Sequence, residues 1–373
     1  MTSTQRPTVT VTETELIRTV QHNCDISDAR DNGIYSICML VLKLRNLYKW
    51  ETGIEPWEEP ESGDLLNWID AKENYWEKII DEPYLPISID GLEIDSYDVA
   101  AINRKLAGRK FLYGAGYGRS LKSIFFLADI ITADTVEGCP VFILGREEAK
   151  ELSSPFAMLQ DGTVIIRREP LRFFFWDHIQ EIRSSSRASL HHALKIYGIL
   201  EKGRLSQEKF RDRLDVIVDQ EIPIFIYHEI GEKMQQTFGS HTLRKIISTF
   251  PDSAIEYVSR AVKDVLADTH PQGMVSYIIR EQREASLGFY IGLLAGLRKE
   301  LFPQLAGIFD EFLKNRDWQV IDEARRHCRE KNLRIAEKIT DIAQLMGNVP
   351  AEKIQLRFNE EILIPLGLDA PEK

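Results

Sequence analysis

The sequence predicts a mainly α protein of the α+β class, a multi-helix bundle that carries a small inserted antiparallel β-sheet. Apolar residues recur every three or four positions through most of the chain, as on the buried face of a helix. Between residues 109 and 169, short β-rich runs alternate instead with Gly-containing turns. We therefore expect an N-terminal helical region at 1–108, the sheet at 109–169 and a C-terminal helical bundle at 170–373.

In the N-terminal region, the apolar spacing predicts a helix at 34–48 that lies deep in the core. An acidic stretch follows Trp50 and is interrupted by prolines and a glycine. It lacks the alternating ligand spacing of a calcium loop, so we interpret it as a solvated loop. Asp64 then caps a second predicted helix, which ends near Ile80.

Four β-rich runs are the predicted strands of the sheet. Their turn-length links predict antiparallel pairing, because a parallel pair needs a long crossover. A glycine-rich segment at 114–118 follows the first run, and a strand rather than a helix comes next. We interpret this segment as a bend or bulge in the sheet, with a ligand loop as the alternative. The four runs are 111–113, 123–132, 141–144 and 163–166.

The C-terminal region is predicted to be almost entirely helical. Pro223 fits the first turn of a new helix. A long helix predicted at 271–298 carries Gly288, Gly292 and Gly296 at four-residue spacing. Each interior glycine costs about 1 kcal/mol relative to alanine, so the stripe indicates a close neighbour. Another helix is the expected neighbour, and a flat ligand in the groove is the alternative.

Composition excludes several classes of protein. The net charge of −11 argues against a nucleic-acid partner, because phosphate neutralisation needs a basic face. Four scattered cysteines without metal-binding or redox spacing favour a cytoplasmic location. We expect no signal peptide, because residues 1–14 are polar and rich in threonine. We expect no membrane partner, because the longest apolar stretch, 285–297, falls short of the roughly twenty residues of a span. A homo-oligomer is compatible with this composition.

Residues with catalytic or metal-binding chemistry concentrate after Pro223, where an apolar run leads into His228, Glu229 and Glu232. His228 and Glu232 are four residues apart and therefore share one face of a helix. A zinc peptidase helix would have a second histidine at position 232, which puts peptidase chemistry in doubt. One histidine and one carboxylate still suit iron, manganese or zinc when further carboxylates join them.

A second cluster consists of Asp264, Asp268 and His270. Asp264 and Asp268 share one helix face, and Asp268 falls in the last turn, where its charge opposes the helix dipole. A positive partner is expected there. It is either a metal or a basic side chain, for which the candidates are Arg244, Lys263 and Arg280. The segment 268–271 also fits a turn and cap before the next helix.

Two functions are consistent with these clusters. In the first, a metal-dependent enzyme binds Fe, Mn or Zn through His228, Glu232 and one or two of Asp264, Asp268 and His270. Glu229 is then the catalytic acid or base on a bound water, and hydrolysis and oxygen activation both stay open. In the second, a non-catalytic helical interaction or scaffold protein uses the same residues as a buried salt-bridge network. Metal content distinguishes the two.

Three segments carry a resemblance when they are taken together: 23–29 (NCDISDA), 44–51 (LRNLYKWE) and 227–232 (YHEIGE). As a set they resemble an uncharacterised group of bacterial cytosolic proteins of about this length. The likeness spans most of the chain. It implies a bacterial, cytosolic protein and transfers no site residue.

Overall fold

The structure, a computed structural model, describes residues 11–180 and 187–368. It is 63% helical with a minor β component, so the prediction of a mainly α protein with β is confirmed. The chain forms two compact units. The first unit comprises the described part of Met1–Ala133 together with Phe142–Phe156 and Arg167–Phe173, and the second comprises the remaining described residues.

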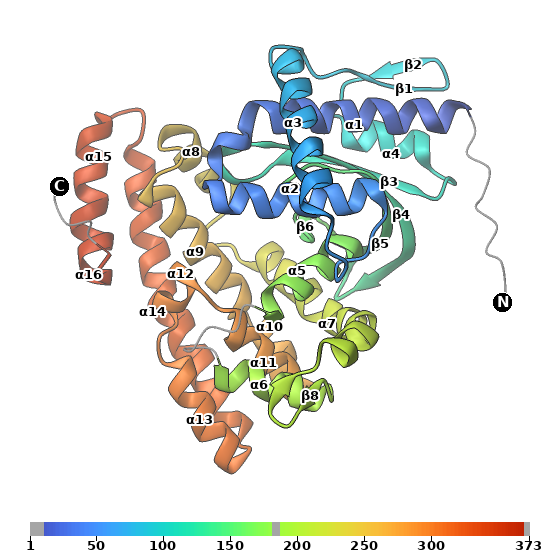
Figure 1. Cartoon of the computed structure of the whole chain (residues 1–373). Coiled ribbons are helices and arrows are strands. Elements are labelled where there is room, and N and C mark those ends of the chain that lie inside the picture. The colour runs from blue at the N-terminus through green and yellow to red at the C-terminus, as the bar shows by residue number, and fades with distance from the viewer. Residues whose placement is uncertain (1–10, 181–186, 369–373) are drawn as a thin grey trace. The chain divides into compact units, whose positions relative to one another are not determined.

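The helices and hairpin of the first unit surround its apolar core. Helix α1 packs on α3 and on strand β1, and α4 packs on β3 (Figure 1). The core includes Leu16 and Val20 of α1 and the inward-facing Phe125 and Leu127. The elements before the main sheet are α1 (Val11–Asp31), α2 (Ile37–Thr52), α3 (Ser62–Ile79), β1 (Ile87–Ile89), β2 (Leu92–Ile94) and α4 (Val99–Leu106).

The prediction that the helix at 34–48 lies deep in the core is wrong for its first half. Helix α2 begins at Ile37, which is 83% exposed, and Val41 and Leu42 are exposed as well. Only the second half is buried, through Leu44, Leu47 and Lys49. Apolar spacing identifies the helix, but burial also needs a neighbouring element along the whole helix length.

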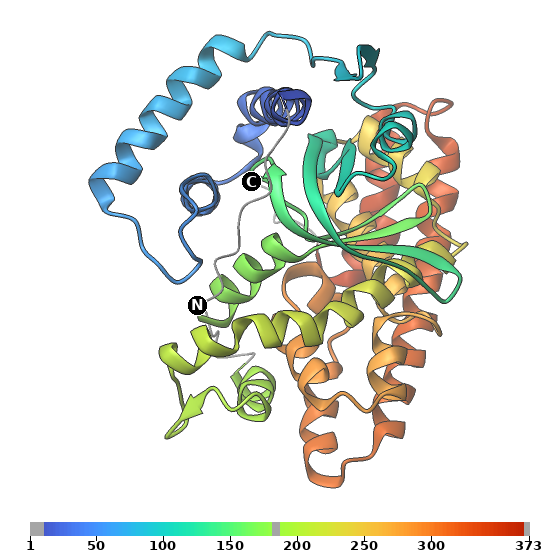
Figure 2. The same ribbon diagram turned by 90° about the vertical axis from the view of Figure 1, so that its right-hand side faces the viewer.

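Five strands form one curled, mixed sheet (Figure 2). Their order in the sheet is β3-β4-β5-β7-β6. Antiparallel pairs join β3 to β4, with Phe111 opposite Asp129, and β6 to β7. Because the sheet as a whole is mixed, the prediction of a purely antiparallel sheet is wrong. Residues 150–162 separate β5 from β7, which is long enough for a parallel crossover. The strands are β3 (Phe111–Tyr117), β4 (Ser123–Val136), β5 (Cys139–Ala149), β6 (Ala157–Gln160) and β7 (Thr163–Arg167).

The glycine-rich segment at 114–118 does not bulge within β3. The register between β3 and β4 is continuous from Phe111 to Tyr117. A Cβ atom at Gly114 would lie 2.1 Å from the ring of Phe126. Gly114 therefore makes room for an aromatic ring on the next strand.

Helices dominate the second unit. Helix α7 packs on α9 and α10, and α9 also packs on α12 and α14 (Figure 1). An antiparallel hairpin in this unit consists of β8 (Leu200–Glu201) and β9 (Arg204–Leu205). Helix α5 (Arg168–Gln180) begins in the first unit and continues into the second. The other helices of the second unit are α6 (Arg187–Ile196), α7 (Gln207–Met234), α8 (Ser240–Thr249), α9 (Ala254–Asp268), α10 (Met274–Arg280), α11 (Glu284–Leu293), α12 (Gly296–Leu301), α13 (Leu305–Asn315), α14 (Trp318–Leu345), α15 (Ala351–Phe358), the π-helical turn η4 (Asn359–Leu363) and α16 (Ile364–Leu366).

Two predicted helix boundaries are wrong. Helix α7 runs through Pro223 instead of starting there. An interior proline costs about 3 kcal/mol, and burial of Ile222 and Ile224 on either side offsets this cost. The predicted helix at 271–298 is divided instead into α10, α11 and α12. Gln282 has a φ angle of +50°, and such a left-handed residue ends an α-helix, so it separates α10 from α11. Leu294 and Ala295 are extended, and they separate α11 from α12.

The glycine stripe packs against a helix, as expected for Gly288 and Gly292. A Cβ atom at Gly288 would lie 2.7 Å from the carbonyl oxygen of Ser189, and one at Gly292 would lie 2.9 Å from the Cβ of Leu190. Both neighbours belong to α6. Gly296 is not part of the stripe, because it begins α12.

We predict that Gly292→Leu destabilises the protein by about 1–3 kcal/mol, because the new side chain intrudes on the α6–α11 contact. Gly307→Leu is the matched control, since nothing lies within 4 Å of a Cβ atom at that exposed position of α13. The control should be neutral or slightly stabilising, because leucine has the higher helix propensity. Chemical denaturation measures both, and equal stability of the two variants would contradict the prediction.

Candidate metal centre

The candidate centre lies at a close contact between α7 and α9 in the second unit. A Cβ atom at Gly231 would lie 2.2 Å from the carbonyl oxygen of Ala267, so only glycine permits this approach. His228 and Glu232 flank Gly231 on α7, and Asp264 and Asp268 flank Ala267 on α9. Each pair is spaced by four residues and shares one helix face. The glycine contact therefore brings the two pairs together.

Three of these side chains can bind one ion. A ring nitrogen of His228 and one carboxylate oxygen each of Glu232 and Asp264 lie within 4.8 Å of one another. Ligand atoms at about 2.1 Å from a common ion are at most about 4.2 Å apart, so binding requires only a small shift of the side chains. All three residues are partly exposed, which gives an ion access to them.

Asp268 is not among the three converging residues, and it has the positive partner that the sequence predicts for it. Its Oδ1 lies 2.6 Å from Nδ1 of His228, and it is fully buried. Its Oδ2 accepts hydrogen bonds from Tyr290, at 3.1 Å, and from Arg298, at 2.5 Å. Because Nδ1 of His228 is engaged, Nε2 is the nitrogen that can bind a metal. A carboxylate behind a histidine ligand is a common outer partner in metal sites.

Neighbouring charges strongly shift the pKa values of His228 and Asp268. Burial alone would lower the pKa of His228, but Asp268 and the nearby carboxylates outweigh it and raise that pKa to about 9. Burial would raise the pKa of Asp268, but Arg298 and His228 outweigh it and lower that pKa to about 2. The metal-free pair is therefore an imidazolium and a carboxylate at neutral pH. Binding a metal at Nε2 must release the His228 proton.

Glu229 is buried beside the cluster on α7. Burial is the main influence that raises its pKa to about 7, and His228 opposes this shift. Burial also raises the pKa of Asp264, against the effect of Arg298. A carboxyl group with a pKa near 7 exchanges its proton readily at neutral pH, which is the property that an acid or base catalyst needs.

His270 lies outside the group of three ligands. Its Nδ1 accepts a hydrogen bond from the backbone nitrogen of Gln272 at 3.1 Å, in the turn after α9. Burial, together with Arg329 and Arg325, lowers the pKa of His270 to about 4. The alternative interpretation of this segment, a turn before the next helix, describes what His270 does in the structure.

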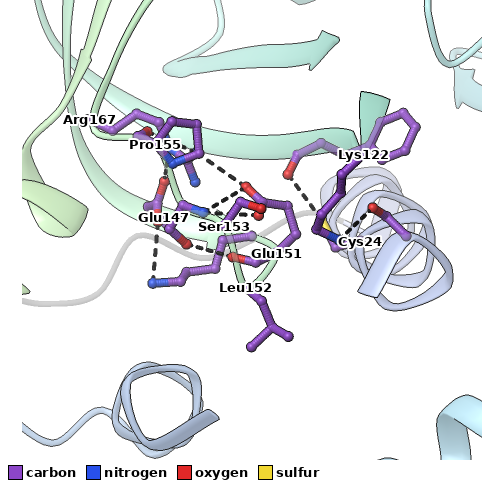
Figure 3. Close-up of polar contacts among 12 residues, drawn as sticks. Cys24, Lys122, Glu147, Glu151, Leu152, Ser153, Pro155 and Arg167 are labelled. Carbon is purple, nitrogen blue, oxygen red and sulfur yellow. Dashed lines mark hydrogen bonds and ion pairs between the residues drawn. The ribbon is translucent and has the colours of Figure 1, made fainter. Parts of the chain in front are cut away.

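The first unit contains a second polar cluster, which the sequence did not predict (Figure 3). Lys122 lies 2.8 Å from Asp28, and Nε of Arg167 lies 2.5 Å from Glu147. All four residues are buried. The sequence of β5 contains a signal for this cluster, because Glu147 lies two residues before Ala149 and therefore on the same, buried face of the strand. The groups are enclosed and paired with one another, so we assign this cluster a structural role.

The fold and the centre define a mainly α, two-unit protein with a histidine and carboxylates gathered between two helices. A family model described as the N-terminal domain of a family of unknown function, DUF6866, matches residues 15–167. The model of the C-terminal domain of the same family matches residues 172–361. The chain therefore belongs to the DUF6866 family, in agreement with its resemblance to an uncharacterised family.

The candidate centre falls within the part of the chain matched by the C-terminal model. No curated protein and no solved structure matches the chain. Within residues 11–180 and 187–368, no helix combines the length and the apolar character that a membrane span requires.

The ion pair between His228 and Asp268 predicts a pH dependence of stability in metal-free protein. The folded pKa of His228, about 9, exceeds the ordinary value of 6.5, so its stabilisation is complete below pH 6.5 and is lost as pH rises through 9. The folded pKa of Asp268, about 2, lies below 3.8, so its stabilisation is lost as pH falls from 3.8 through 2. We expect the free energy of unfolding of the wild type to exceed that of His228→Gln by the largest amount at about pH 4–6.5. This difference should shrink by about pH 10.

His270→Gln is the control, because its expected pH dependence has the opposite sign. The folded pKa of His270, about 4, lies below 6.5, so this residue destabilises the wild type increasingly as pH falls from 6.5 to 4. Urea denaturation in the presence of a chelator measures all three proteins. A pH-independent difference between wild type and His228→Gln would show that the ion pair does not form.

Proposed function

We propose that the second unit binds a divalent transition metal through His228, Glu232 and Asp264, and that the protein is a metal-dependent enzyme. The observation that supports this most is the convergence of three ligand atoms, from three partly exposed residues, within 4.8 Å, together with the His228–Asp268 hydrogen bond. One imidazole nitrogen and two carboxylate oxygens suit Zn, Mn or Fe. The resemblance noted above makes a bacterial cytosolic setting part of this proposal.

The reaction class we favour is metal-assisted hydrolysis. A bound divalent ion would supply Lewis acidity and lower the pKa of a water molecule. The chain supplies the rest: Asp268 orients the His228 ring, and Arg298 and Tyr290 hold Asp268 in place. Glu229, with its pKa raised by burial to about 7, would accept and return a proton beside the ion.

A scaffold protein remains the second candidate, because a specific set of contacts favours it. Lys263 lies 2.5 Å from Glu232, and Arg298 and His228 both contact Asp268. Basic groups of the chain therefore neutralise two of the carboxylates without an ion. In this case the cluster fixes the register of α7 against α9, and the protein acts through its surface.

Metal binding distinguishes the two functions. We expect wild-type protein to bind close to one equivalent of Zn, Mn or Fe, and chelation to lower its melting temperature, because a ligand of the folded state stabilises it. His228→Ala and the nearly isosteric Glu232→Gln should each lose the ion, whereas His270→Ala should keep it. Elemental analysis and calorimetric titration measure this. A wild type that binds none of the three metals would support the scaffold.

The role of Glu229 is tested separately from metal binding. We predict that Glu229→Gln binds metal within a few-fold of wild type, because Glu229 is not among the converging ligand atoms. In the loaded protein, hydrolysis of a panel of esters, phosphoesters and amides should fall by about 10²–10⁴-fold, the usual contribution of a general acid or base. Equal rates for the variant and wild type on a hydrolysed substrate would contradict this role.

A further inference from the structure

Lys263 is the basic residue in closest contact with the proposed ligands. It precedes Asp264 on α9 and is largely buried, with 10% of its side chain exposed. Its Nζ lies 2.5 Å from Oε1 of Glu232 on α7. Within the part of the chain that the structure describes, Lys263 is the residue that forms an ion pair with Glu232. The ammonium group thus holds one of the three proposed metal ligands.

We propose that Lys263 is a built-in competitor of the metal: its ammonium group binds Glu232 in the empty centre and must move aside, at least in part, when a divalent cation binds. This inference rests on the proposed function. Its consequence is a centre that is stable when empty and that exchanges its metal, so that loading depends on the available metal concentration. The competition makes metal loading a regulated step.

Electrostatics support the competition. An ammonium group and a divalent ion that share one carboxylate would lie only a few ångströms apart, and like charges at such a distance repel strongly where burial reduces screening. When the ion is absent, the same ammonium group offsets the mutual repulsion of Glu229, Glu232 and Asp264, which each face a nearby carboxylate. Lys263 therefore favours the empty state and opposes the loaded one.

The other basic group of the centre differs in a way that makes Lys263 the mobile one. Arg298 contacts Asp268, which lies behind His228 and outside the three ligands, so it can keep its position when a metal binds. A lysine side chain is flexible and carries a compact charge, whereas an arginine guanidinium is held by its planar geometry. The rigid cation, Arg298, thus contacts the supporting carboxylate of Asp268, and the flexible cation, Lys263, contacts the proposed ligand Glu232.

The test compares Mn²⁺ binding by wild type and Lys263→Met, by calorimetric titration. We expect Lys263→Met to bind Mn²⁺ at least tenfold more tightly than wild type and to melt at a lower temperature when empty. Lys233→Met is the matched control. Lys233 is exposed and adjacent in sequence to Glu232, but its ammonium group donates to the carbonyl oxygen of Gly162 at 2.8 Å. Its removal should change Mn²⁺ affinity by less than threefold.

The outcomes separate this inference from the proposed function. If wild type binds Mn²⁺ and Lys263→Met binds it equally or more weakly, the competition is overturned and the metal centre stands. If neither protein binds Mn²⁺, Zn²⁺ or Fe²⁺, the metal centre itself is overturned. Binding by Lys263→Met alone would support the competition in its strongest form. Should Lys263→Met fail to fold, Lys263→Gln provides the same comparison with a polar side chain.

Discussion

The contact between Gly231 and Ala267 is the constraint on which the candidate centre depends. The carbonyl oxygen of Ala267 occupies the space that a side chain at position 231 would need. A glycine inside a helix is unfavourable by about 1 kcal/mol relative to alanine, and here it permits the backbones of α7 and α9 to meet. Gly273 makes a similar contact, because a Cβ atom at that position would lie 2.1 Å from the same carbonyl oxygen. Two glycines therefore fix the position of one turn of α9.

The four acidic groups near this contact differ in role because their partners differ. Asp268 is enclosed by His228, Tyr290 and Arg298, and its pKa is lowered because the charges of Arg298 and His228 outweigh burial. Glu229 is buried too, but there the effect of burial exceeds the opposing charges of His228 and Lys263, so its pKa is raised instead. Glu232 and Asp264 stay partly exposed. Carboxyl groups of the same chemistry thus divide into one that supports His228, one that we propose as the proton carrier and two candidate ligands.

Sequence reasoning identified the two i, i+4 pairs because that spacing alone places side chains on one helix face. It also predicted that Asp268 needs a positive partner, yet it did not name Arg298, which comes from a helix 30 residues further along the chain. Lys263 was among the proposed partners, but its contact is with Glu232. Spacing within one helix says nothing about which residue of another helix faces it.

Other elements show the same limit. Pro223 fits a helix start by its local preference, but burial on both sides of it keeps α7 continuous. The helices and most strands were predictable because their apolar patterns are local. The pairing of β7 with β5 and the exposure of the first half of α2 were not, since both depend on which elements meet in the folded chain.

The polar cluster of the first unit and the candidate centre differ in exposure, and this difference is why we place the proposed chemistry in the second unit. In the first unit, Lys122, Asp28, Glu147 and Arg167 are enclosed, and removing one partner of such a pair typically costs about 3–5 kcal/mol. No substrate can reach these groups while the unit is folded. In the centre between α7 and α9, His228 keeps 15% of its side chain exposed and Glu232 keeps 20%. A polar cluster that stays partly open while its supporting carboxylate is fully buried combines access with a fixed geometry, and a binding site needs both.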